Sequence, residues 1–284
     1  MAHASLSQNT VSSLRRHLRS ARRPLSRQLS PLLSQMRFAR RFRALALGAL
    51  VAFGCPFLAH AQSGPDAPLG PDARAALQYL DSQNFTALDA ELMAIQASFE
   101  KGAITEYQLR NAYRAFYNLS EPEQRAMLAW EQHSPNSYAM HLARGVELKQ
   151  MGSQARGKRF ISETSEASIQ GMEYYFNLSS KELMSSLKLT PKPYLSVFHL
   201  MSIAGFTGDS QATLVLLNAA NHMFPANQLA RERYMMFLQP KWGGSHEAME
   251  AFLARSRQDG ADAAGLAILQ QAVNGPCDCM ASQQ

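Results

Sequence analysis

Three prolines in the middle of the chain constrain its fold more than any other feature. Pro135, Pro191 and Pro225 each follow one segment of helical apolar periodicity and precede another. Proline cannot continue the helix behind it, but it is tolerated at the start of the helix ahead. The interval from Pro191 to Pro225 equals the length of a tetratricopeptide repeat. The pattern predicts helix pairs that stack on one another.

Helical spacing also dominates the rest of the domain, and no segment alternates with period two. We therefore predict an all-α, tetratricopeptide-like right-handed solenoid of about ten helices over residues 71–273, after a linker at 62–70. Such an array buries its apolar stripes only by stacking and has a concave face. One stripe, at i, i+4, i+7 and i+11, is formed by Leu88, Leu92, Ile95 and Phe99.

The repeats are degenerate. Gly145 and Ala220 occupy small-residue positions of the repeat, but Met201 and Met235 stand at the position of Gly145 in the other two units. The interval from Pro135 to Pro191 exceeds one period by more than half a period. We expect the extra length to include a loop at Gly152–Thr164.

The charge of the chain changes sharply near residue 62. Ten arginines and no acidic residue precede Asp66, which leaves 18 basic and 22 acidic residues and a formal net charge of −4 from Asp66 onward. The apolar run 44–54 is short for a membrane span and is followed by Ala59-His60-Ala61, an A-x-A cleavage site. The pattern predicts a signal peptide at 36–61 that starts at Met36 and is cleaved after Ala61.

This leader indicates a periplasmic or secreted protein with no stable membrane span after cleavage. Residues 1–35 are then a start-site extension without ordered structure. Two alternatives remain: a mitochondrial transit peptide, since residues 1–43 are rich in Arg and Ser, and a lipoprotein modified at Cys55. Residues 274–284 are expected to be a disordered tail, in which Cys277 and Cys279 have no role in the fold.

A loop with three basic residues is the first candidate binding site. Arg156, Lys158 and Arg159 form the only basic cluster found along the domain, and the negative net charge gives no support for nucleic-acid binding. The cluster could receive an acidic partner, a carboxylate or a phosphate. In the alternative interpretation it is a solvated surface or pairs with Glu163 and Glu166.

Trp242-Gly243-Gly244-Ser245 is the second candidate. The glycines would allow a tight backbone path, Ser245 would cap the next helix, and Trp242 would close the end of the core. A Trp242 that faces a ligand is the alternative interpretation.

No pattern of catalytic or metal-binding residues is recognisable. The histidines lack the spacing of metal ligands, and His199 is interpreted as a packed or hydrogen-bonded core residue. Nucleophile elbows and phosphate-binding glycine loops are also missing from the sequence. We therefore expect no cofactor, no metal and no enzymatic activity. A group of methionines is interpreted as adaptable core, namely Met223, Met235, Met236 and Met249.

Residues 84–257 resemble a bacterial family known only as domain of unknown function 4034. Three segments carry the likeness: Leu80–Asp89, Ala155–Thr164, and Pro240–Ser245 before Met249 and Phe252. The resemblance implies an exported or envelope-associated helical-repeat protein and brings no established chemistry.

The sequence thus favours an exported, non-enzymatic module that binds a protein or peptide in its concave groove. One alternative is an enzyme of unknown class with a pocket around Arg156, Glu163 and Trp242. The other is an accessory subunit of an envelope or secretion assembly.

Overall fold

The computed structural model describes residues 68–157 and 163–275, and within them the chain forms α-helices and short 3-10 helices with no strand. This confirms the all-α prediction. The predictions for residues 1–35, for the signal peptide, for Cys55 and for Cys277 and Cys279 lie outside the described residues. The predicted disordered tail at 274–284 starts too early, because Asn274 is helical. The helices are α3 (Pro71–Asp81), α4 (Phe85–Glu100), α5 (Glu106–Ala112), α6 (Glu121–His133), α7 (Tyr138–Arg156), α8 (Glu166–Ser186), α9 (Tyr194–Phe206), α10 (Ser210–Met223), α11 (Leu229–Phe237), α12 (His246–Gln258) and α13 (Ala263–Asn274), with 3-10 helices η1 (Tyr113–Phe116) and η3 (Pro240–Trp242).

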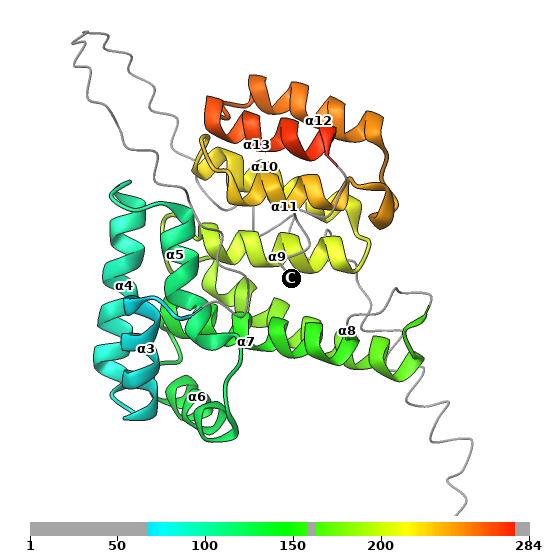
Figure 1. The fold of residues 1–284 in the computed structure, drawn as a ribbon. Coiled ribbons are helices and arrows are strands. Elements are labelled where there is room, and N and C mark those ends of the chain that lie inside the picture. The colour runs from blue at the N-terminus through cyan, green and yellow to red at the C-terminus, as the bar shows by residue number, and fades with distance from the viewer. Residues whose placement is uncertain (1–67, 158–162, 276–284) are drawn as a thin grey trace, which may run out of the picture.

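The helices from α7 to α13 are stacked layer upon layer, and α3 to α6 pack against one flank of the stack (Figure 1). The three prolines mark the turns between layers as predicted. Pro135 lies between α6 and α7, Pro191 between α8 and α9, and Pro225 between α10 and α11. None of the described helices is both long enough and apolar enough to cross a membrane.

The first helices of successive pairs form a continuous row. Contacts join α7 to α9, α9 to α11, and α11 to α13, while α8 and α10 each pack beside the helix before and the helix after them. We call α7, α9, α11 and α13 the leading row. Because residues one repeat apart occupy the same place in successive helices, side chains on this row can line up across layers.

Much of the extra length between Pro135 and Pro191 lies in the long helices α7 and α8, so the predicted loop at Gly152–Thr164 is wrong at its start. Helix α7 continues through Gly152 to Arg156, and α8 is 21 residues long. The glycine is explained by packing: a Cβ on Gly152 would lie 2.5 Å from the Phe176 ring of α8. It lets two helices approach and does not bend the chain.

A second close contact of the same kind supports the predicted repeat position of Gly145. A Cβ on this residue would lie 2.6 Å from Cγ of Leu183. The backbone carbonyl of Gly145 also accepts a hydrogen bond from the buried Ser179 hydroxyl at 2.6 Å. The contact between α7 and α8 is the most extensive between any two described helices.

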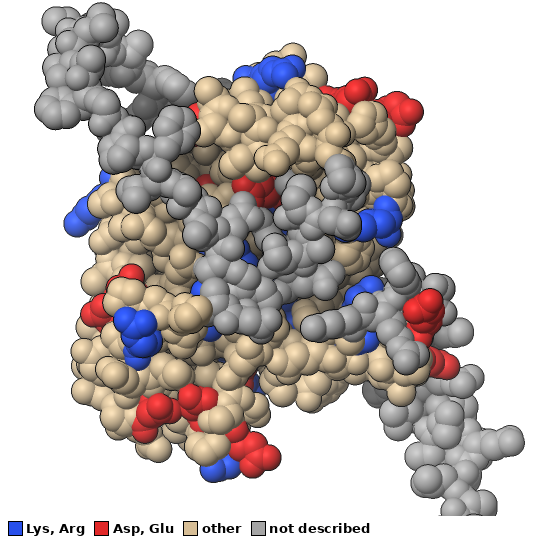
Figure 2. Space-filling view, in the orientation of Figure 1, with Lys and Arg blue, Asp and Glu red and all other residues tan. Residues whose placement is uncertain are grey.

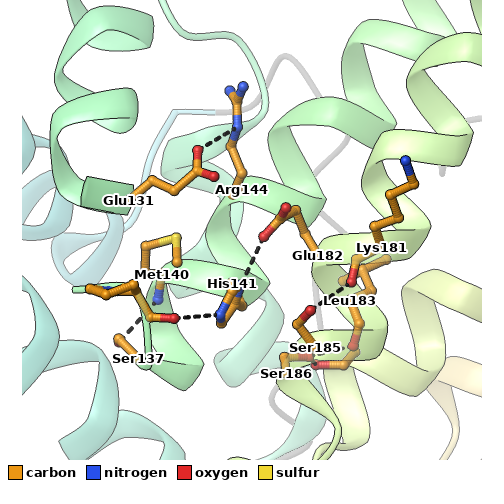
Figure 3. A network of polar contacts seen from close by, with 12 residues as sticks. Glu131, Ser137, Met140, His141, Arg144, Lys181, Glu182, Leu183, Ser185 and Ser186 are labelled. Atoms are coloured by element: carbon orange, nitrogen blue, oxygen red, sulfur yellow. Dashed lines mark hydrogen bonds and ion pairs between the residues drawn. The ribbon is translucent and has the colours of Figure 1, made fainter. Parts of the chain in front are cut away.

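A network of charged side chains ties α6 and α8 to α7 (Figure 3). Nδ1 of His141 on α7 lies 2.7 Å from the Glu182 carboxylate of α8. Arg144 contacts Glu147 on its own helix at 2.5 Å and Glu131 on α6 at 3.7 Å. His141 and Arg144 thus each have a carboxylate partner. We call this group the α6–α8 network.

Candidate functional site

The basic loop predicted from the sequence begins where α7 ends. Arg156 is the last residue of α7, and Gly157 follows it with a positive φ of 74°. Arg156 and Glu163 line the same pocket, which has a volume of about 450 Å³ and lies between the end of α7 and the start of α8. Lys158 and Arg159 lie outside the described residues.

Arg156 also connects this pocket to the tryptophan. Its guanidinium carbon lies 6.0 Å from the centroid of the Trp242 ring, the distance of a cation–π contact. No ion pair joins it to Glu163 or Glu166 within the described part of the chain. The structure therefore brings Arg156 beside both Glu163 and Trp242, although the predicted salt bridge is not formed there.

The Trp242–Ser245 segment has the geometry expected of a structural turn. Gly243 has a left-handed φ of 86°, and a Cβ on Gly244 would overlap the backbone of Leu238. The Ser245 hydroxyl accepts a hydrogen bond from the Ala248 amide at 3.2 Å and caps α12. The half-buried Trp242 ring packs on Phe206 and Phe237, at centroid distances of 5.7 and 6.0 Å. These contacts close the end of the core.

A second group of basic side chains lies on the leading row and on α5, which packs beside it. Its members come from four helices that pack together: Arg110 of α5, Lys149 of α7, His199 of α9 and Arg233 of α11. We call them the central cationic cluster. Lys149 Nζ and the Arg233 guanidinium carbon each lie 5.9 Å from the centroid of the Phe206 ring. The Phe206 ring thus contacts cations from two helices, α7 and α11.

The electrostatics indicate that these groups act on one another. Burial, with Arg233 and Arg110 close by, lowers the pKa of Lys149 from 10.5 to about 7. Burial and the charges of Lys149, Arg110 and Arg233 hold the pKa of His199 well below its usual value, so the ring is neutral at pH 7. Three helices, α5, α7 and α11, therefore concentrate positive charge around a neutral imidazole from α9.

One carboxylate of the described chain reaches the cluster. Glu232 of α11 is fully buried, and its charge acts to raise the pKa values of Arg110 and Arg233. It accepts hydrogen bonds from the Tyr107 hydroxyl at 2.9 Å and from the Gln228 amide at 3.1 Å. A single negative charge does not balance two guanidinium groups and a lysine, so these described side chains carry a net positive charge.

Sequence reasoning missed this cluster, because it looked for basic residues close together along the chain, and these four side chains meet only through packing. His199 is packed in the core as expected, being 1% exposed, but neither ring nitrogen has a hydrogen-bond partner among the described residues. A signal was present in the repeat, because the interval from His199 to Arg233 equals the interval from Pro191 to Pro225. His199 and Arg233 therefore occupy one repeat position on successive helices of the leading row.

On the face shown in Figure 2, basic and acidic side chains are both visible in the middle of the molecule and along its edges. Among the described residues, no group of three His, Cys, Asp or Glu side chains could hold a metal ion. The four methionines interpreted as core are buried or partly buried against the core.

A family model described as Domain of unknown function (DUF4034) matches residues 208–264, from the turn before α10 to the first residues of α13. This confirms the likeness expected from the sequence, in the stretch that contains Pro240–Ser245. The other two segments that suggested it lie outside the matched residues. No curated protein and no solved structure matches the chain. The function therefore has to be argued from the sites themselves.

Proposed function

We propose that the chain is an exported helical-repeat module that binds an acidic protein or peptide along its leading row and has no catalytic activity of its own. The observation that carries the proposal is that Lys149, His199 and Arg233, from three successive helices of that row, lie close together. Repeat proteins bind partners along such rows, because stacking turns one position of the repeat into a continuous surface.

The stacked pairs and the equal spacing of Pro191–Pro225 and His199–Arg233 support a solenoid whose leading row faces a groove. A row that carries excess positive charge favours a negatively charged partner, both in the rate of encounter and in the choice between partners. The Arg156–Trp242 contact at the end of α7 would extend the same surface by one further cation.

Site-specific photocrosslinking in cells tests this proposal. Benzoylphenylalanine replaces Phe206, whose ring contacts both Lys149 and Arg233, or Tyr174 on α8, which is 60% exposed. Both changes keep an aromatic ring. We expect a defined protein adduct from position 206 and none from position 174. The same adducts from both positions, or none from 206, would contradict binding on the leading row.

The proposed export is tested at the N-terminus. Terminal mass spectrometry of the protein recovered from the periplasm or medium should give Gln62, or its cyclised form, as the first residue. A retained leader or a lipid on Cys55 would contradict the proposed cleavage after Ala61.

The pocket shared by Arg156 and Glu163 favours a second candidate function, an enzyme of unknown class. A carboxylate and a guanidinium that line one pocket can orient a small polar substrate, and the Trp242 ring, which contacts Arg156, does not itself line the pocket. Any turnover found for the purified protein should then fall in Glu163→Gln and persist in Glu173→Gln, a carboxylate on α8. Equal activity of the two variants would reject this pocket as a catalytic site.

A further inference from the structure

We propose that the central cationic cluster is a binding site for a single oxyanion, a phosphate or carboxylate group, held by Arg110, Lys149, His199 and Arg233. The inference rests on the proposed function and deepens it, since it names the chemical group that the leading row recognises. The site would anchor one acidic group of the partner, or take the free anion.

The side chains of the central cationic cluster converge on one region of the protein. Lys149 and Arg233 both approach Phe206, each 5.9 Å from its centroid, and Arg233 is also 5.7 Å from the Phe198 ring. The Phe198 and His199 rings are 5.1 Å apart. Arg110 is close enough for its charge to act on Lys149, His199 and Arg233. Side chains from four helices thus meet in one region.

Several polar atoms of the cluster have no hydrogen-bond partner in the described chain. Both ring nitrogens of His199 are buried and have no hydrogen-bond partner in the described chain, which costs free energy when nothing compensates. Lys149 Nζ makes no hydrogen bond or ion pair with any described residue. Nε of Arg110 donates to the Tyr117 hydroxyl at 3.3 Å, and its terminal nitrogens have no hydrogen bond within the described ranges.

The cluster is partly accessible to solvent. Lys149 and Arg110 are only partly buried, so solvent reaches them, whereas His199 is almost fully buried and lies deeper. A small anion could meet the two cations first and the imidazole N–H last. Guanidinium groups offer paired donors that match a carboxylate or phosphate, and a neutral imidazole adds one donor. An anion would also offset the cost of gathering like charges away from water.

Calorimetric titration of the purified full chain tests the site. The probes are inorganic phosphate, acetyl-Ala-Ala with a free carboxylate, and the same dipeptide as its amide. Lys149→Met removes a central charge, and Lys181→Met makes the same change at an exposed position on α8. We expect wild-type protein and Lys181→Met to bind at least one of the two anions with the same affinity, and Lys149→Met to bind about tenfold more weakly or not at all.

Binding of phosphate alone would identify a free or esterified phosphate as the ligand, and binding of the acid but not the amide would identify a carboxylate. The proposal is overturned if neither anion binds at about 10 mM, or if both lysine variants lose affinity equally. Thermal unfolding without ligand checks that Lys149→Met is folded. The photocrosslinking above reports separately on the partner: an adduct at position 206 without anion binding would reject the site and keep the proposed function.

Discussion

Two groups of charged side chains have members on helix α7, and they differ in how far acidic partners balance their positive charges. In the α6–α8 network, His141 and Arg144 each contact carboxylates, at distances from 2.5 to 3.7 Å. In the central cationic cluster, Lys149 faces two arginines, and a single carboxylate of the described chain lies near. The first arrangement stabilises a layer of the fold. The second costs stability, which is the expected property of a site arranged for a ligand.

The largest change in stability is expected when a charge pair of the α6–α8 network is broken. Arg144→Met leaves the Glu147 carboxylate, which is 3% exposed, without its partner. Unpaired buried charge is strongly destabilising, so urea unfolding should show a loss of about 3 kcal/mol. Adding Glu147→Gln to this variant removes the charge and should restore most of that loss. A loss below about 1 kcal/mol in the single variant would show that the network contributes little.

In the central cationic cluster, removing a charge is expected to raise the stability of the protein. Lys149→Met removes a partly buried cation with no anionic partner among the described residues and keeps an unbranched side chain. The free energy of unfolding at pH 7 should therefore rise by about 1–2 kcal/mol. A decrease would mean that the Lys149 charge stabilises the ligand-free protein, which would remove the contrast between the two groups.

The effect of Lys149→Met on stability should also depend on pH. Because the pKa of Lys149 is about 7 in the folded protein and the usual lysine pKa of 10.5 applies in the unfolded chain, the unfolded chain binds more protons between those limits. Stability from this group therefore increases as the pH rises above 7, by at most about 1.4 kcal/mol per unit. The advantage of Lys149→Met over wild type should shrink between pH 7 and pH 9. A constant difference would contradict the lowered pKa.

A smaller change with the reverse pH dependence is expected for His141. Its pKa is raised because Nδ1 contacts the Glu182 carboxylate, while Nε2 lies 2.9 Å from the Pro135 carbonyl oxygen, so both nitrogens donate when the ring is charged. This stabilisation is fully present below pH 6.5 and is lost as the pH rises through the folded pKa. His141→Gln should cost under about 1 kcal/mol at pH 6 and less at pH 8. An equal cost at both pH values would point to packing alone.

The smallest effect is expected from the loop after α7. Replacing Arg156, Lys158 and Arg159 together by Ser should change the free energy of unfolding by under about 0.5 kcal/mol. If the loop binds an acidic partner, the variant should lose affinity and salt dependence together. Unfolding of the variant would instead identify the Arg156 contact with Trp242 as a structural support.

The fold could be predicted because its signals are local. Pro135, Pro191 and Pro225 mark the turns, and apolar periodicity marks the helices between them. Gly152 misled the prediction, since glycine serves a tight helix contact as readily as a bend, and its partner Phe176 lies on another helix. Tertiary packing decides between the two roles, and sequence spacing does not.

The site was harder to predict, because its members come from separate helices. Arg110 and Lys149 lie far apart in sequence, and only stacking brings them near His199 and Arg233. The one-repeat step from His199 to Arg233 could have been found, but it pairs two different residue types and so escapes a search for identical repeats. The Arg156–Glu163 pocket was accessible to prediction because both residues flank one turn.

The glycines of α7 also have a mechanical consequence. Leu183 and Phe176 sit in the gaps left by Gly145 and Gly152, so α7 and α8 cannot slide along each other without lifting both side chains out. The two helices therefore move as one rigid unit. Each helix is roughly 30 Å long, as calculated from its number of residues and the rise of an α-helix per residue. Any change in the curvature of the molecule must then occur at the turns that carry Pro135 and Pro191, where this unit joins the neighbouring helices.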